Sequence, residues 1–148
     1  KSLGKTMMVW EGFGPGGSVP ISKDIVVVAY ESSYYRPDAL LQDGYTVINA
    51  SWRPLYVVND RNWSPEEIYG WNVGYWGHFV DWMPSYGGIQ VGPQPKLLGS
   101  MMCAWEQPSQ REFDSLKHRL AAMSERAWHP RARIGFADFW RRLQKITP

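Results

Sequence analysis

The chain has 148 residues and fits a single domain, 1–148, whose hydrophobic content of 44% is sufficient for a packed core. No apolar stretch reaches the roughly 18 residues of a membrane span, and the net charge of +2 with scattered Lys and Arg argues against a nucleic-acid partner. Cys103 cannot form an internal disulfide and the three histidines lack metal-ligand spacing, so we expect no metal site and no cofactor.

Four short apolar runs predict the strands. They are TMMVW (6–10), DIVVVAY (24–30), YTVINAS (45–51) and KLLGSMMCAW (96–105). Their apolar residues are continuous rather than alternating, which is typical of parallel strands covered on both faces. A Gly/Pro-rich loop, EGFGPGGSVP (11–20), separates the first two runs.

The segments after the second and third runs predict helices. RPDALLQDG (36–44) suits a short helix that ends at Gly44. WSPEEIYGWNVGYWGHFVDWMP (63–84) predicts a longer helix with Ser64 as its N-cap and Pro65 in its first turn. Aromatic residues recur in it at helical spacing and predict a stripe facing the core: Trp71, Tyr75, Phe79 and Trp82.

Two further helices are predicted after the fourth run. The first covers 109–128 and is expected to bury one apolar face, formed by Phe113, Leu116, Leu120 and Met123. The second is the amphipathic segment 135–146. Strands that alternate with helices predict an α/β fold with right-handed βαβ units.

Four parallel strands with helices outside correspond to half of a (β/α)8 barrel, because a whole barrel needs about 250 residues. The alternative is a small doubly wound sheet. That architecture is less favoured because no GxGxxG turn or phosphate-binding loop opens a helix.

Aromatic and polar residues follow each predicted strand, where parallel folds carry their sites. They are Trp10 and Glu11; Tyr30 and Glu31; Trp52, Tyr56 and Asn59; and Trp105, Glu106 and Gln107. Aromatic rings beside hydrogen-bonding groups suit the binding of sugars, and the competing interpretation is that the rings only pack.

The spacing of Gly99, Cys103, Trp105 and Gln107, followed by AAMSERAW (121–128), resembles the last strand and helix of glycoside hydrolase family 20, the β-N-acetylhexosaminidases. KTMMVWEGF, DIVVVAY and TVINASWRPLYVV with WSPEEIYGWN resemble strands five to seven in the same order. The resemblance implies the C-terminal half of the catalytic barrel, strands 5–8. It also implies hydrolysis of terminal N-acetylhexosamine residues by a substrate-assisted retaining mechanism.

The resemblance also assigns roles. Trp10 and Trp105 would wall the acetamido cavity, Tyr56 would donate its hydroxyl to the acetamido oxygen, and the polar group after the last strand would hold the outer sugar hydroxyls. Tyr30, Trp52 and Asn59 complete the predicted substrate-binding set with Glu106 and Gln107.

Three positions depart from the family pattern. Tyr30 stands where many members have tryptophan, Val58 and Asn59 follow Tyr56 where an aspartate is usual, and Gln107 replaces a glutamate. Glu106 supplies the nearest carboxylate, which a small shift of the strand tip would bring to that position.

The family's catalytic pair is an adjacent Asp-Glu after the fourth strand, and this sequence contains no adjacent Asp-Glu. The catalytic residues are therefore expected outside this chain, and Glu66 and Glu67 are explained by a helix start.

Exposed strand edges near Met8 and Met101 predict a second chain that completes the barrel, either an unlike N-terminal half or a homodimer mate. Two alternatives to a hydrolase remain, a non-catalytic hexosamine-binding module and a purely oligomerising one. The residues leave the compartment open, and the resemblance is compatible with a secreted or periplasmic protein.

Overall fold

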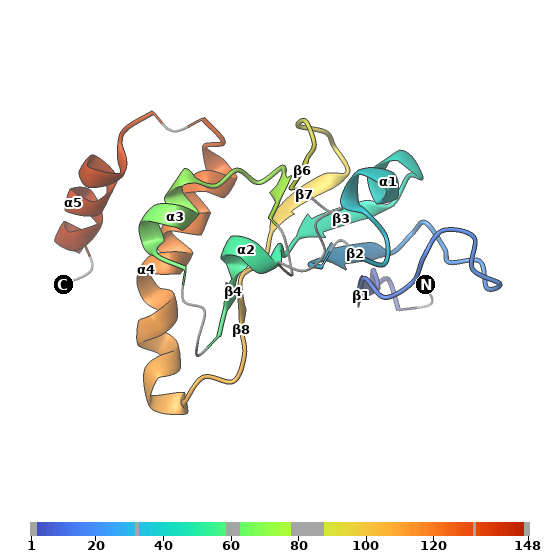
Figure 1. Cartoon of the computed structure of the whole chain (residues 1–148), viewed down its shortest axis with the longest axis horizontal. Coiled ribbons are helices and arrows are strands. Elements are labelled where there is room, and N and C mark those ends of the chain that lie inside the picture. Colours follow the sequence, from blue (N-terminus) through green and yellow to red (C-terminus); the bar gives the residue numbers. More distant parts are fainter. Residues whose placement is uncertain (1–2, 32, 59–62, 78–87, 132, 147–148) are drawn as a thin grey trace. The chain divides into compact units, whose positions relative to one another are not determined.

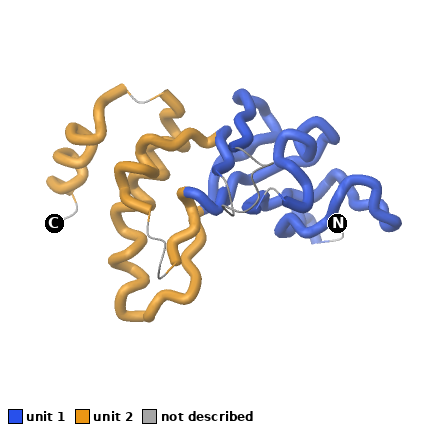
Figure 2. The backbone as a smooth tube through the Cα atoms, viewed as in Figure 1, with its two compact units in different colours: residues 1–53, 74–101 blue, residues 54–73, 102–148 orange. Residues whose placement is uncertain are grey.

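The computed structural model describes residues 3–31, 33–58, 63–77, 88–131 and 133–146. They form two compact units (Figure 2). Unit 1 comprises residues 1–53 and 74–101, and unit 2 comprises residues 54–73 and 102–148. Among the described residues, none of the helices combines the length and the hydrophobicity that a membrane-spanning helix needs.

Unit 1 is built on a four-stranded parallel sheet with the order β1-β2-β3-β7 (Figure 1). The strands are β1 (Met8–Trp10), β2 (Val26–Ala29), β3 (Thr46–Asn49) and β7 (Leu97–Ser100). The prediction of an α/β fold with parallel strands is therefore confirmed. β1 and β7 are the edges of this sheet, as expected from the sequence.

One face of the sheet packs against α1 (Pro37–Gln42). The register aligns Val9 with Val27 and Val27 with Val47, so these side chains share that face. Val27 and Val47 are fully buried, and Leu40 of α1 packs in the same cluster.

The predicted end of α1 at Gly44 is confirmed. Gly44 has a φ of +87°, and its N–H donates to the carbonyl of Leu41 at 3.1 Å, while the N–H of Tyr45 donates to Leu40 at 3.0 Å. These two bonds form a Schellman motif, which satisfies the last carbonyls of the helix.

The predicted long helix over 63–84 is wrong. Helix α3 covers only Pro65–Gly70, and Tyr75–Trp76 forms a short strand, β5, that pairs antiparallel with β6 (Ile89–Gln90). Trp76 is 1% exposed and its indole N–H donates to the carbonyl of Ala29 at 3.0 Å. Trp76 makes this distant contact from the extended backbone of β5, so tertiary packing overrides the aromatic spacing. Phe79 and Trp82 lie outside the described residues.

The start of α3 is as predicted. The Ser64 hydroxyl accepts the N–H of Glu67 at 3.1 Å, and the Glu67 carboxylate accepts the N–H of Ser64 at 2.9 Å. The two bonds form a capping box, and Pro65 occupies the first turn.

The predicted continuous strand 96–105 is divided between the units. β7 ends at Ser100, and β8 (Cys103–Ala104) pairs in parallel with β4 (Tyr56–Val57) in unit 2. Gly99 has a φ of +142°, and the pairing of β3 with β7 shifts register between Val47 and Ile48. These irregularities interrupt the ladder, so a single straight strand does not form.

Unit 2 is otherwise helical. It contains α3, α4 (Ser109–Trp128) and α5 (Phe136–Ile146). The first boundary between the units along the chain falls within the short α2 (Trp52–Leu55). The helix expected at 109–128 is confirmed. Its predicted buried face is only partly buried, because Met123 packs in the core cluster whereas Phe113 is 77% and Leu120 43% exposed.

Candidate functional site

Two aromatic side chains meet at the carboxyl ends of β1 and β2 in unit 1. The rings of Trp10 and Tyr30 are perpendicular, with centroids 5.5 Å apart. Trp10 is opposite Val28 in the register, so Tyr30 is its diagonal neighbour on the same face. Trp10 is 42% exposed, which leaves its ring accessible to a ligand.

A buried carboxylate joins the ends of these two strands. Glu11 is 4% exposed, and its Oε2 accepts the backbone N–H of Tyr30 at 3.1 Å. The N–H of Glu11 donates to the carbonyl of Val28 at 3.0 Å. Glu11 therefore fixes the backbone on which both Trp10 and Tyr30 stand.

The Tyr30 hydroxyl stays protonated. Burial raises its pKa well above the ordinary value, and the carboxylates of Glu31 and Glu11 raise the pKa further. Glu31 in turn accepts the hydroxyl of Ser33 at 2.8 Å. The Tyr30 hydroxyl donates to the Glu31 carboxylate, and its oxygen keeps acceptor capacity for a ligand.

Trp52 follows β3 and lies next to the second strand end. Its backbone N–H donates to the carbonyl of Tyr30 at 3.1 Å. Unit 1 thus brings together three of the predicted residues, Trp10, Tyr30 and Trp52, at successive strand ends.

Sequence reasoning missed the polar support of the third strand end. Asn49 and Ser51 are both fully buried. The Asn49 side chain accepts the N–H of Ser51 at 2.8 Å and donates to the carbonyl of Tyr75 at 3.0 Å. The Ser51 hydroxyl accepts the N–H of Gly77 at 2.8 Å. The signal in the sequence is polar residues that interrupt the apolar run 45–51.

Unit 2 carries the second group of predicted residues, around β4 and β8. Tyr56 is buried and is paired in register with Cys103. Burial raises the pKa of the Cys103 thiol to about 11, although hydrogen bonds with the Tyr56 and Trp105 side chains act in the opposite direction. Trp105 is 50% exposed beside this buried pair.

The residues after β8 turn back onto β4. The N–H of Trp105 donates to the carbonyl of Val57 at 3.2 Å, and the side-chain amide of Gln107 donates to the same carbonyl at 3.3 Å. Glu106, between them, has a φ of +57°, the one positive value among the described residues other than glycine. A left-handed residue costs about 1–2 kcal/mol, and it allows both neighbours to reach Val57.

The contacts after β8 limit the sugar-binding role predicted for Gln107. One amide N–H of Gln107 binds the protein's own backbone, so its side chain is partly committed to holding the turn. Asn59 lies outside the described residues. No group of three or more His, Cys, Asp or Glu that could hold a metal ion occurs in the described part of the chain.

The arrangement at each set of strand ends is a half-exposed tryptophan next to fixed hydrogen-bonding groups. Such a combination can stack on the apolar face of a ring-shaped ligand and hydrogen-bond to its edge. The roles assigned from the resemblance stay predictions.

Comparison with known proteins gives two matches. The family described as "Glycosyl hydrolase family 20, catalytic domain" matches residues 1–131. A lacto-N-biosidase of Bifidobacterium bifidum is 30% identical over 115 residues, which are 74% of this chain and 10% of that protein. The chain therefore spans about a tenth of the length of this relative.

Proposed function

The chain belongs to glycosyl hydrolase family 20, and on that premise we propose that it is part of a β-N-acetylhexosaminidase. The enzyme would release terminal N-acetylhexosamine residues from glycans. In the substrate-assisted retaining mechanism, the acetamido oxygen of the substrate attacks its own anomeric carbon, which replaces a protein nucleophile. This chain would supply contacts to the sugar.

The observation that carries the proposal is the extent of the family match. It covers residues 1–131 and so includes every predicted substrate-binding residue, from Trp10 to Gln107. The relative's name, lacto-N-biosidase, is that of a glycosidase, which agrees with a glycan substrate.

Within this proposal, the strand-end residues bind the sugar. The family resemblance assigns contacts with the acetamido group to Trp10 and to Trp105, and it assigns a hydrogen bond with the acetamido oxygen to the Tyr56 hydroxyl. Tyr30, Trp52 and Asn59 contact the rest of the sugar, together with Glu106 and the part of Gln107 that is not engaged by Val57. The partial exposure of Trp10 and Trp105 supports a contact of each ring with a ligand, since neither ring is fully buried in the core.

The Asp-Glu catalytic pair lies outside this chain in the proposal, because no adjacent Asp-Glu occurs in its sequence. A second segment, on another chain or the same one, would provide it and pair with the sheet edges. Both edges carry exposed apolar side chains that fit such a contact, with Met8 54% exposed on β1 and Leu98 59% exposed on β7.

The test is the native mass of the purified protein, measured beside hydrolysis of a chromogenic N-acetyl-β-glucosaminide. We expect turnover from an assembly heavier than the 17.1 kDa chain that includes an unlike segment with the Asp-Glu pair. A multiple of 17.1 kDa that binds N-acetylglucosamine without turnover would instead support the non-catalytic binding module.

Variants separate the sugar contacts from general packing. Trp105→Ala is expected to abolish N-acetylglucosamine binding at the strand-end residues, whereas Trp128→Ala, a tryptophan 81% exposed at the end of α4, is expected to leave that binding unchanged. Equal binding by both variants would contradict the assignment of Trp105.

A further inference from the structure

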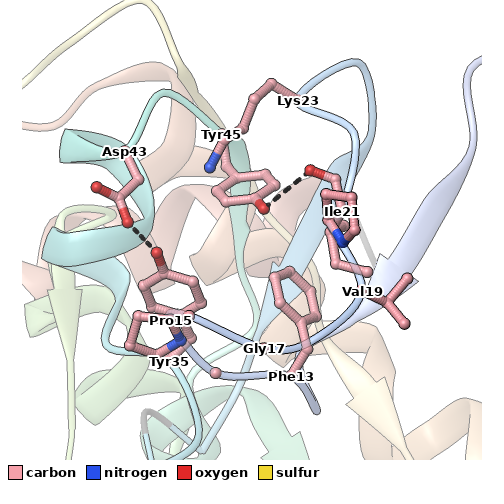
Figure 3. Close-up of a pocket in the computed structure, with 12 residues that line it drawn as sticks. Phe13, Pro15, Gly17, Val19, Ile21, Lys23, Tyr35, Asp43 and Tyr45 are labelled. Atoms are coloured by element: carbon pink, nitrogen blue, oxygen red, sulfur yellow. Dashed lines mark hydrogen bonds between the residues drawn. The ribbon is translucent and has the colours of Figure 1, made fainter.

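Unit 1 contains a cavity that the proposed function does not use. It has a volume of about 520 Å³ and lies among the Gly/Pro-rich loop, the C-terminal end of α1 and the start of β3 (Figure 3). Its volume falls within the range of about 300–1,000 Å³ that is typical of small-molecule sites.

The cavity has a structural cause. Parallel strands are usually joined by a crossover helix, but residues 11–25, which join β1 to β2, form no helix and no strand. The loop crosses the face where that helix would pack, and Phe13 is the aromatic side chain it inserts there. One ring fills less space than a helix, so a hollow remains beside it.

Three aromatic rings give the cavity a fixed wall. The centroid of Phe13 is 5.8 Å from that of Tyr35 and 5.6 Å from that of Tyr45, and the two tyrosines are 6.1 Å apart, all edge to face. The Tyr45 hydroxyl donates to the carbonyl of Ile21 at 3.3 Å, which ties the loop to the start of β3. Mutual packing of this kind preorganises a site.

Two opposite charges stand at the rim. The Nζ of Lys23 lies 3.5 Å from the centroid of the Tyr45 ring, and Asp43 accepts a hydrogen bond from the Tyr35 hydroxyl. That bond raises the pKa of Tyr35 to about 12, so the hydroxyl keeps donating at physiological pH. A carboxylate has further acceptor capacity, and the exposed Lys23 side chain can move aside and donate to a ligand.

The charges and the aromatic wall of the cavity indicate the chemical class of its ligand. The paired charges cancel, which disfavours a strongly cationic or anionic ligand, and the aromatic wall favours a ligand with an apolar face. Gly14, Gly16 and Gly17 line the cavity without side chains, so backbone groups can be approached closely. A neutral sugar ring has an apolar face and a rim of hydroxyl groups.

We propose that this cavity is a second saccharide-binding site, which takes a neutral sugar unit between the aromatic wall and the Gly/Pro-rich loop. It is distinct from the strand-end residues of unit 1. Strand alternation puts Trp10 and Val28 on the face opposite to Val9 and Val27, and the cavity belongs to the Val27 face. The choice of a saccharide as the ligand rests on the proposed function, whereas the presence of a ligand-binding cavity does not depend on it.

The test is a titration of the full chain with N-acetylglucosamine, followed by amide and indole signals in nuclear magnetic resonance spectra. We expect saturable shifts of the Gly14, Gly16 and Gly17 amides. Gly17→Leu puts a side chain at the cavity wall, and its Cβ would lie 3.9 Å from the carbonyl oxygen of Gly14. This variant is expected to raise the dissociation constant at this site at least tenfold. The matched control Gly12→Leu lies in the same loop outside the cavity and should change it less than twofold.

Three results would overturn the inference. The first is unmoved loop amides while the Trp10 and Trp105 indole signals shift, which would leave the proposed function intact. The second is an equal effect of Gly17→Leu and Gly12→Leu. The third is tighter binding of choline or acetate than of the sugar at the loop. Shifts confined to the loop would support the cavity site and contradict the strand-end part of the proposed function instead.

Discussion

Removal of the Glu11 side chain should loosen the junction between β1 and β2. Glu11 is 4% exposed, and its carboxylate accepts the Tyr30 N–H at 3.1 Å. A hydrogen bond to a charged group is worth about 1.5–3 kcal/mol, and Glu11→Ala leaves a donor without this acceptor. We therefore expect a loss of about 2 kcal/mol for Glu11→Ala. Glu11→Gln retains an acceptor oxygen and should lose about 1 kcal/mol or less.

The local assay is hydrogen exchange of the Tyr30 amide. A loss of about 2 kcal/mol corresponds to exchange roughly 30-fold faster, since about 1.4 kcal/mol is a factor of ten. Urea unfolding followed by tryptophan fluorescence gives the global effect. The control is Glu31→Ala, which removes a neighbouring carboxylate that hydrogen-bonds the side chains of Ser33 and Tyr30 and not the Tyr30 amide. The reasoning is refuted if Tyr30 exchanges at the wild-type rate in Glu11→Ala, or if the Ala and Gln variants are equally destabilised.

Three other changes test the structure in different ways. Gly44→Ala should destabilise the protein by about 1–2 kcal/mol because the φ of Gly44 is +87°. Gly70→Ala lies in helix α3 with space for a Cβ and should stabilise the protein by up to about 1 kcal/mol. The opposite order of stabilities in urea unfolding would contradict the backbone conformations assigned to these two glycines. Trp76 is 1% exposed, so Trp76→Ala should lower the free energy of unfolding by about 3–5 kcal/mol. Trp105 is 50% exposed, so Trp105→Ala should lower it by less than about 2 kcal/mol. Similar losses for both variants in urea unfolding would favour a pure packing role for Trp105. The folded-state pKa of Cys103 is raised from 9.0 to about 11, so its contribution to stability is present below pH 9 and is lost as pH rises toward 11. Between these values the wild type should therefore lose stability faster than Cys103→Ala, and parallel pH profiles would contradict the burial argument.

The end of α1, the start of α3 and the first three strands could be predicted because their signals are local. Ser64 and Gly44 act on backbone groups within a few residues, through the capping box and the Schellman motif. The strands near Val9, Val27 and Val47 are marked by short apolar runs that only a sheet covered on both faces would hide.

The end of α3 and the division of the fourth run could not be predicted by the same means. Trp76 leaves the helical pattern because its indole binds the carbonyl of Ala29, 47 residues earlier. β8 leaves the main sheet because Cys103 pairs with Tyr56, and the intervening Gly99 has a positive φ. Hydrophobic periodicity depends only on residues that are close in the sequence, so it cannot predict contacts between residues that are distant in the sequence.

The candidate site divides in the same way. Local pattern and chain order were enough to predict the parallel α/β class and the aromatic and polar residues that follow the strands. Three features emerge only in the folded chain: Glu11 binds the backbone of Tyr30, Val57 accepts from both Trp105 and Gln107, and a loop without a helix leaves a cavity beside Phe13. These features depend on which distant groups meet, because buried polar groups and apolar surfaces are satisfied by neighbours in space and not by neighbours in sequence.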